Sequence, residues 1–460
     1  MTAAASIWAA RAWLPAGWRE NVLLRTGSDG RWAEVIADVG KAPTGVVIVE
    51  GPLLPGLVDG HSHAFQRAFA GLAERREAGH DDFWSWRDRM YRVALAVTPK
   101  VQRAVAAQLY VELLCGGYTQ VCEFHYLQRD VGGVPYADPL ELSWAIADAA
   151  TDAGIGITLL PVIYERAGFD ATELRDDQRR FRASAREVWS AQQALAASRR
   201  PLLSAGLAIH SLRAATQPSI AELRALAEGF AGPIHIHAAE QVAEVEACIA
   251  ATGARPIEWL ARERLLDPRW QLVHATHATR DEIDAVAAGG AGIVLCPSTE
   301  GNLGDGIPNL SGWLDAGVPI AIGTDSQITR DWREELRWLE YAQRLSRRER
   351  NVAARPEAKL PSTAERLFSL VADGRAAGEA SWGLIAGARA DALVVDARDP
   401  ALIGIAPAQS LDALVFSSPA RSFRDVLVAG QWVVHDGKHP RAEAIAKGFE
   451  AAMAELWQAG

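Results

Sequence analysis

Cysteine is scarce in this sequence, and long apolar runs are absent. The four cysteines, Cys115, Cys122, Cys248 and Cys296, form no Cys-x-x-Cys pair, which argues against a disulfide framework and predicts buried thiols in a reducing compartment. No apolar run reaches the ~20 residues that a bilayer requires. The first residues, MTAAASIWAARAWLPAGW, lack the basic region and uninterrupted apolar core of a signal peptide. We therefore expect a cytoplasmic protein.

Lysine is also rare: five of the 47 Lys and Arg residues are lysine, and none lies between residues 101 and 358. The net charge of −10 argues against binding to nucleic acids or anionic membranes, so we expect neither partner. Hydrophobic residues make up 49% and charged residues 23% of the chain, as in ordinary globular proteins. The 460 residues are too many for one ordinary core, although a (β/α)₈ barrel can be several hundred residues long.

Eight short apolar runs recur through the middle of the chain, each followed by a longer stretch with helical spacing. Strands that alternate with helices predict an α/β fold with a closed parallel (β/α)₈, or TIM, barrel. The alternative is a doubly wound open sheet, but no GxGxxG motif follows any of the runs. The runs span residues 56–61, 118–126, 155–164, 204–211, 233–240, 270–277, 291–298 and 318–325.

The two ends of the chain have a different pattern. Residues 1–55 and 386–460 carry short strand-like segments separated by turn residues. We interpret them as one small β-sandwich domain built from both termini, with the barrel occupying residues 56–385. The charged, proline-containing segment 346–363 is expected to be an exposed excursion.

Histidines and carboxylates gather at the ends of the predicted strands, and the active site of a (β/α)₈ barrel lies at these ends. His61 and His63 are two residues apart on the first strand, so both project from the same face. His237 ends the fifth strand and Asp325 the eighth. Imidazoles suit Zn²⁺, Fe²⁺ or Ni²⁺, and a carboxylate completes a site that keeps a position open for water. We predict a divalent metal, Zn²⁺, bound by His61, His63, His237 and Asp325.

These segments resemble the amidohydrolase superfamily. LPGLVDGHSH is similar to its first-strand motif, GTDS to its eighth-strand motif, and GLIAGARADALVV with VLVAGQWVVHDGK to its β-sandwich. HAFQRAF, FWSWRDRMY, HSLRA, HIHAAEQ, LVHATH and LCPSTEGNLGDGI resemble the formimidoylglutamate deiminase family within it. The family segment EANLGDG reads EGNLGDG here, with Gly301 beside the predicted site. The resemblance implies a homodimer that converts N-formimino-L-glutamate to N-formyl-L-glutamate and ammonia.

The number of metals follows from the lysine distribution. Superfamily members with two metals bridge them with a carbamylated lysine at the end of the fourth strand, or sometimes with a glutamate. The fourth strand here ends at His210, and residues 101–358 contain no lysine. We therefore expect one metal.

Three residues at the strand ends are the predicted catalytic groups. Glu240 follows His237 by three residues and is assigned to proton transfer with the substrate nitrogen. Asp325 is expected to accept the proton of the attacking water, and His274 to orient or polarise that water. The alternative interpretation of Glu240 is a carboxylate stabilised by a helix N-terminus.

A glutamate substrate carries two carboxylates, which arginine forks match. Arg213 follows His210 by three residues, and Arg87 lies in a tryptophan-rich segment after the first strand, where Arg89 is a competing candidate. Any single arginine among so many is more often a solvated surface residue. The predicted auxiliary donors are Gln66, Tyr126 and His210.

Two other functions compete with this interpretation. The first is an aminohydrolase of an aromatic heterocycle such as guanine or cytosine. Such an enzyme requires a flat apolar slot rather than two residues that bind anionic groups. The second is a metal-free barrel kept for subunit assembly. All four predicted ligands are present, which argues against this second possibility.

Overall fold

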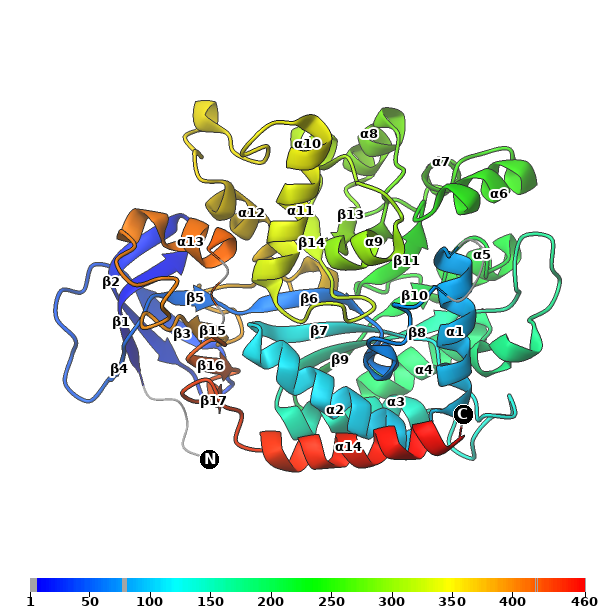
Figure 1. Cartoon of the computed structure of the whole chain (residues 1–460), viewed down its shortest axis with the longest axis horizontal. Helices are drawn as coiled ribbons and strands as arrows, with labels where there is room; N and C mark the ends of the chain where they lie inside the picture. Colours follow the sequence, from blue (N-terminus) through cyan, green and yellow to red (C-terminus); the bar gives the residue numbers. More distant parts are fainter. Residues whose placement is uncertain (1–5, 77–80, 418, 420, 460) are drawn as a thin grey trace.

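The computed structural model describes residues 6–76, 81–417, 419 and 421–459. Its larger sheet is a nearly closed parallel barrel in which each strand neighbours the next one along the chain, with the short β9 (Leu203–Ala205) added beside β8 (Figure 1). The predicted (β/α)₈ barrel is therefore confirmed. Its strands are β6 (Leu57–Ser62), β7 (Tyr118–His125), β8 (Gly156–Ile163), β10 (Leu207–Ile209), β11 (Ile234–Ala238), β12 (Trp270–His274), β13 (Gly292–Leu295) and β14 (Ile320–Ile322).

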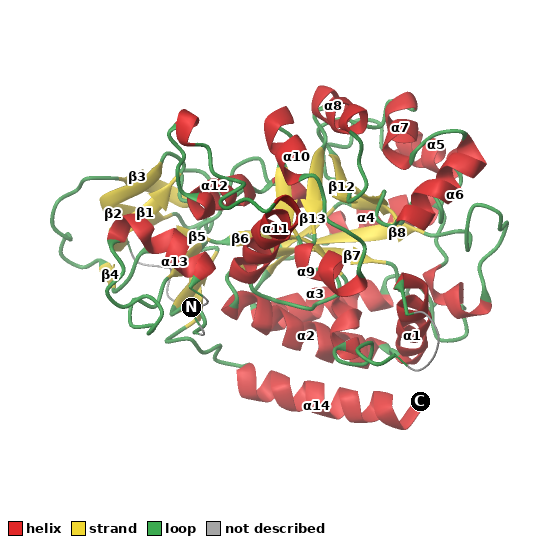
Figure 2. Cartoon of the chain, turned by 45° about the horizontal axis from the view of Figure 1, so that its top comes forward, coloured by secondary structure: helices red, strands yellow, loops and turns green. Residues whose placement is uncertain are grey.

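Helices surround the barrel (Figure 2). Several begin where the sequence places a capping side chain; Ser184 and Glu187 form a capping box at α4, as do Thr279 and Glu282 at α8. Among the described residues, no helix is both long and apolar enough to cross a membrane. The helices are α1 (Phe83–Ala96), α2 (Pro99–Cys115), α3 (Glu141–Ala153), α4 (Ala185–Ala197), α5 (Gln217–Leu226), α6 (Val242–Thr252), α7 (Pro256–Arg262), α8 (Arg280–Gly289), α9 (Pro297–Leu303), α10 (Leu310–Ala316), α11 (Trp332–Arg347), α12 (Thr363–Val371), α13 (Ser410–Phe416) and α14 (Ala442–Ala459).

The second sheet is built from both ends of the chain, as predicted. Antiparallel pairing of Leu54 with Leu393 joins the N-terminal strands to the C-terminal ones. The last helix, α14, does not cover this sheet but lies along α2 (Figure 1). The domain limits at 55/56 and 385/386 stay predictions. The strands are β1 (Ile7–Leu14), β2 (Gly17–Thr26), β3 (Trp32–Ile36), β4 (Val47–Val49), β5 (Leu53–Pro55), β15 (Ala392–Val394), β16 (Asp425–Val428) and β17 (Gln431–Val434).

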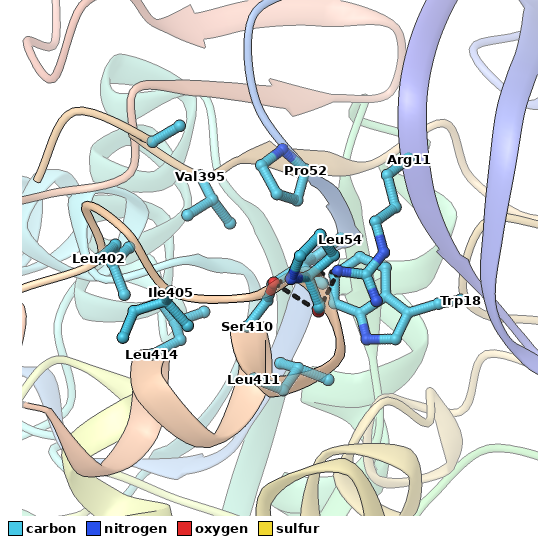
Figure 3. A pocket seen from close by; sticks show the side chains of 12 residues that line it. Arg11, Trp18, Pro52, Leu54, Val395, Leu402, Ile405, Ser410, Leu411 and Leu414 are labelled. Carbon is cyan, nitrogen blue, oxygen red and sulfur yellow. Dashed lines mark hydrogen bonds between the residues drawn. The ribbon is translucent and has the colours of Figure 1, made fainter.

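An apolar cavity of about 190 Å³ lies between this terminal sheet and α13 (Figure 3). The guanidinium of Arg11 stacks on Trp18 at 3.9 Å from the ring centroid and donates a hydrogen bond to Ser410 Oγ at 3.0 Å. None of the predicted site residues lines this cavity. It is therefore separate from the strand ends that carry the histidines.

The barrel closes where the end of β6 meets the end of β14. The backbone N–H of Asp325 donates to the carbonyl of His61 at 2.9 Å, and the N–H of His63 donates to the carbonyl of Asp325 at 3.2 Å. Gly323 permits this approach, because a Cβ there would lie 2.8–2.9 Å from the Cβ, N and O atoms of His61. We call this contact the seam. It brings residues from the first and last barrel strands within reach of one metal ion.

A buried polar network supports the seam. The Asp59 carboxylate accepts hydrogen bonds from the N–H and Oγ1 of Thr324, at 2.9 and 2.6 Å. Gln327 Nε2 donates to Ser62 Oγ, which in turn donates to Glu123, each at 3.0 Å. Burial raises the pKa of Asp59 to about 7 and that of Glu123 to about 8. The network fixes the turns that carry the first and last predicted metal ligands.

Replacing Gly323 by alanine is expected to lower the free energy of unfolding of the metal-free protein by about 1–3 kcal/mol, because the added methyl group overlaps His61. Chemical denaturation followed by circular dichroism measures this change. The matched control is Gly448→Ala in α14, where a Cβ meets nothing within 4 Å and a helical alanine is favoured by up to about 1 kcal/mol. An unchanged free energy in Gly323→Ala would contradict a tight seam.

Candidate active site

Three imidazoles converge at the C-terminal mouth of the barrel. His61 Nε2 lies 3.1 Å from His63 Nε2 and 3.0 Å from His237 Nε2, and all three side chains are buried. Asp325 Oδ1 lies 3.5 Å from His61 Nε2 and 3.4 Å from His63 Nε2. Four ligand atoms around a tetrahedral Zn²⁺, with bonds of about 2.0–2.1 Å, lie about 3.3 Å apart. The four distances given above, 3.0–3.5 Å, therefore match those between ligands of one metal ion.

The protonation of these rings also fits a bound cation. His63 Nδ1 lies 2.9 Å from the carbonyl of Phe124, and His237 Nδ1 lies 2.9 Å from the carbonyl of His210. A carbonyl only accepts, so both Nδ1 atoms carry the proton and both Nε2 atoms present lone pairs. Burial, followed by the neighbouring imidazoles, lowers the pKa of His61 and His237 well below the usual range. The lone pairs of His63 Nε2 and His237 Nε2 both face His61 Nε2. A cation bound among the three nitrogens would pair with these lone pairs.

The two oxygens of Asp325 face different partners. Oδ1 faces His61 and His63, whereas Oδ2 lies 3.8 Å from His274 Nε2. Asp325 and His274 both have left-handed backbones, with φ of +48° and +69°, a conformation that costs about 1–2 kcal/mol for a residue with a Cβ. The fold thus holds strained residues at the strand ends that carry these side chains.

A second group of potential ligands shares Asp325: the ligand atoms of His274, Cys296 and Asp325 lie within 4.8 Å of one another. Burial, and then the Asp325 carboxylate, raises the pKa of the Cys296 thiol well above its usual range. A metal at this group would have to displace the proton of that thiol, which lowers its affinity. The histidine group described above is the better candidate.

His274 lies among carboxylates. Its Nε2 is 3.6 Å from Glu240 Oε1, and its Nδ1 is 3.5 Å from Glu300 Oε1. Burial lowers the pKa of His274, but Glu240, Glu300 and Asp325 outweigh it and raise the pKa to about 10. Burial raises the pKa of Glu240 to about 7. Glu240 precedes α6 and does not belong to its first turn; the carboxylate in that turn is Glu244. The Glu244 carboxylate accepts a hydrogen bond from the backbone N–H of Glu240 at 2.8 Å.

One cavity of about 50 Å³ connects the predicted site residues. His61 is fully buried and does not line it. Arg89 points elsewhere, since it contacts Asp81 and the carbonyl of Ala73, each at 3.2 Å. The cavity is lined by the predicted residues His63, Gln66, Arg87, Tyr126, His210, Arg213, His237, Glu240, His274 and Asp325.

Two of these lining residues are buried arginines with free donors. Arg87 is 9% and Arg213 8% exposed. Arg87 Nε and Arg213 Nη1 have no hydrogen-bond partner among the described residues, although Arg87 Nη2 lies 3.4 Å from the exposed Asp88. Buried cations of this kind favour an anionic partner. The cavity thus combines a metal-ligand group with two guanidiniums.

The site also contains residues that were not predicted from the sequence. Tyr164 directly follows β8, and its hydroxyl lies 3.1 Å from that of Tyr91 on α1; the strand-end rule could have found it. Asp305 lies in the GNLGDG segment, and burial followed by Glu240 raises its pKa to about 9. Strand periodicity gives no signal for the cavity wall formed by α1. Asp305 does not itself line the cavity; the lining residues missed besides Tyr91 and Tyr164 are Phe83, Trp86, Met90 and Leu303.

Comparisons with known proteins agree with this architecture. The sequence profile described as the Amidohydrolase family matches residues 53–433. A formimidoylglutamate deiminase from Pseudomonas aeruginosa is 44% identical over 456 residues, which cover 98% of this chain and 99% of that protein. The crystal structure of an amidohydrolase from Brucella melitensis has a TM-score of 0.92 at 39% identity, covering 98% of this chain and 100% of that one.

A structure with much lower sequence identity has a similar fold. An adenosine deaminase from Xanthomonas campestris, crystallised with bound zinc, has a TM-score of 0.76 at 21% identity and covers 98% of each chain. At this identity the likeness concerns the fold alone. The profile match and the 44% relative confirm the predicted resemblance. The chain belongs to the amidohydrolase family.

Proposed function

We propose that this protein hydrolyses N-formimino-L-glutamate to N-formyl-L-glutamate and ammonia. The observation that carries the proposal is the pair of buried guanidiniums, Arg87 and Arg213, with unpartnered N–H groups in the same cavity as the histidines. A glutamate tail has two carboxylates to neutralise them. The name of the Pseudomonas aeruginosa relative supports the same substrate.

We propose that one Zn²⁺ ion is held by His61, His63, His237 and Asp325. A bound Zn²⁺ lowers the pKa of a coordinated water to about 7 and so supplies hydroxide at neutral pH. The neutral imidazoles support this assignment, as does the zinc in the related adenosine deaminase fold. The absence of lysine from residues 101–358 favours one metal rather than two.

Side chains of the protein would accept and donate the protons of the reaction. Asp325 accepts the proton of the attacking water through Oδ2, the oxygen that faces His274, and His274 orients that water. Glu240, whose pKa of about 7 suits both uptake and release of a proton, delivers one to the departing nitrogen. The formimino group is an amidine and is positively charged at neutral pH. The carboxylates beside His274 therefore complement it in charge.

The glutamate tail would bind at the other polar groups of the cavity. Bidentate contacts from Arg87 and Arg213 match the two carboxylates. Gln66 Nε2 donates one of its two hydrogens to the hydroxyl of Tyr126 at 3.1 Å, so the other can be donated to a carboxylate. His210 is the remaining auxiliary donor.

An aminohydrolase of guanine or cytosine is the alternative, and the adenosine deaminase fold is compatible with it. A neutral ring would leave the unpartnered N–H groups of both buried guanidiniums without an anionic acceptor, which is costly, so we favour the dicarboxylate. A metal-free scaffold would not account for the converging imidazoles. We further propose a cytoplasmic homodimer, on the basis of the family resemblance and the four free, buried or half-buried cysteines.

The purified protein is expected to release ammonia from N-formimino-L-glutamate and not from guanine. Arg213→Met should lower kcat/KM at least about tenfold, since one charge-assisted hydrogen bond contributes roughly 1.5–3 kcal/mol. Arg89→Met is the matched control and should change kcat/KM less than about threefold, because Arg89 binds Asp81. A preference for guanine or cytosine, or full activity in Arg213→Met, would contradict the substrate assignment.

His63→Ala is expected to lose both metal and activity, since a four-ligand site has no spare ligand. Elemental analysis of the purified variants measures the metal content, and the unaltered protein should contain one metal per chain. In the control His277→Ala the metal should remain, because His277 bonds to the carbonyl of Asp305 instead. Two metals in fully active protein would contradict the single site.

Glu240→Gln should retain its metal but lose turnover by roughly 10²–10⁴-fold. The amide keeps the shape and the hydrogen bonding of the side chain but cannot transfer the proton. Steady-state kinetics and metal analysis of the same sample separate the two effects. A kcat near that of the unaltered enzyme would remove Glu240 from the proton-transfer role.

A further inference from the structure

One indole ring contacts both proposed anchors of the substrate tail. The Cζ atom of Arg87 lies 4.6 Å from the centroid of the Trp84 ring, and the Cζ atom of Arg213 lies 5.1 Å from it. Arg87 belongs to the same helix as Trp84, whereas Arg213 lies in the segment after β10. Two guanidiniums from separate parts of the barrel therefore share one aromatic partner.

The local sequence fixes Trp84 in this position. Asp82 caps α1 by accepting the N–H groups of Trp84 and Ser85, at 2.9 and 3.1 Å, and its own N–H donates to Ser85 Oγ at 3.0 Å. Phe83 packs edge-on against the indole, with ring centroids 5.0 Å apart. The first turn of α1 thus places the ring against the two arginines that line the cavity, although the ring itself does not line it.

The contact leaves the arginines able to bind an anion. A guanidinium can stack its flat face on an aromatic ring while its N–H edge binds a carboxylate. Arg87 Nε and Arg213 Nη1 are such unoccupied edge donors. The negative face of the ring also offsets the repulsion between two buried like charges.

We propose that Trp84 is a positioning residue that holds Arg87 and Arg213 by its ring and leaves their N–H groups free for a ligand with two carboxylates. This inference rests on the proposed function for the identity of the ligand. The helix packs on the barrel through other side chains: the Trp86 ring lies 5.7 Å from that of Phe69 and is buried. Trp84 is only half-buried, so its replacement should leave the fold intact.

The test compares Trp84→Leu with Trp84→Phe in the metal-loaded enzyme. Calorimetry measures the Kd of glutarate and of N-formyl-L-glutamate, and kinetics measure KM and kcat for N-formimino-L-glutamate. Trp84→Leu should raise Kd and KM about tenfold, because two cation–π contacts are lost, while kcat changes less than about twofold. Trp84→Phe keeps a weaker aromatic face and should restore part of the affinity.

The matched control is Trp144→Leu, because Trp144 on α3 also lies under a guanidinium, that of Arg200 at 4.5 Å, but Arg200, unlike Arg87 and Arg213, does not line the cavity. Its Kd and KM should be unchanged. An unchanged glutarate Kd in Trp84→Leu would overturn the inference, as would a lower kcat at unchanged KM. If Trp84→Leu does not fold, Trp84→Phe decides, since a Kd equal to that of the unaltered enzyme would also overturn it.

Failure of the role proposed for Trp84 can be distinguished from failure of the substrate assignment. If the unaltered enzyme does not hydrolyse N-formimino-L-glutamate but Trp84→Leu still weakens glutarate binding, the substrate assignment fails and the positioning role stands. If the enzyme hydrolyses the substrate and Trp84→Leu binds glutarate normally, the positioning role fails alone.

Discussion

The contact between the ends of β6 and β14 is the constraint on which the candidate site depends. Two backbone hydrogen bonds join His61, His63 and Asp325, and Gly323 allows the strands to approach that closely. Residues more than 260 positions apart in the chain thereby share one small volume. The buried network from Asp59 to Glu123 stabilises both turns, so the geometry of the proposed metal ligands His61, His63 and Asp325 is part of the barrel closure rather than an addition to it.

Charge is distributed unevenly within the cavity. Neutral imidazoles and carboxylates of raised pKa surround the proposed metal position, where an attacking water and a cationic amidine would meet. The buried guanidiniums of Arg87 and Arg213 favour an anionic group. A molecule that carries an amidine at one end and two carboxylates at the other complements both features, whereas a neutral heterocycle complements neither.

The barrel, and the convergence of the proposed ligands at its mouth, could be predicted because their sequence signals are local. Strand residues alternate between faces, so His61 and His63 had to point the same way, and parallel strands end at one mouth. The tryptophan-rich segment that forms α1 could be linked to the site through Arg87, but which of its other side chains line the cavity could not be predicted, because helix orientation is set by packing. Sequence spacing alone did not decide between Arg87 and Arg89; the structure directs Arg89 to Asp81. The sequence places Trp84 in this segment but could not indicate its proposed role, which depends on Arg213 from a distant segment.

The most direct test of the proposed mononuclear site is X-ray absorption spectroscopy at the metal edge of the fully active protein. A site formed by His61, His63, His237 and Asp325 should show a single Zn²⁺ with imidazole nitrogens at about 2.0–2.1 Å and a carboxylate oxygen in its first coordination sphere. A sulfur neighbour at about 2.3 Å would indicate Cys296 as a ligand, and a second metal at about 3.5–4 Å would indicate a binuclear centre. Either result would contradict a mononuclear site formed at the closure of the barrel.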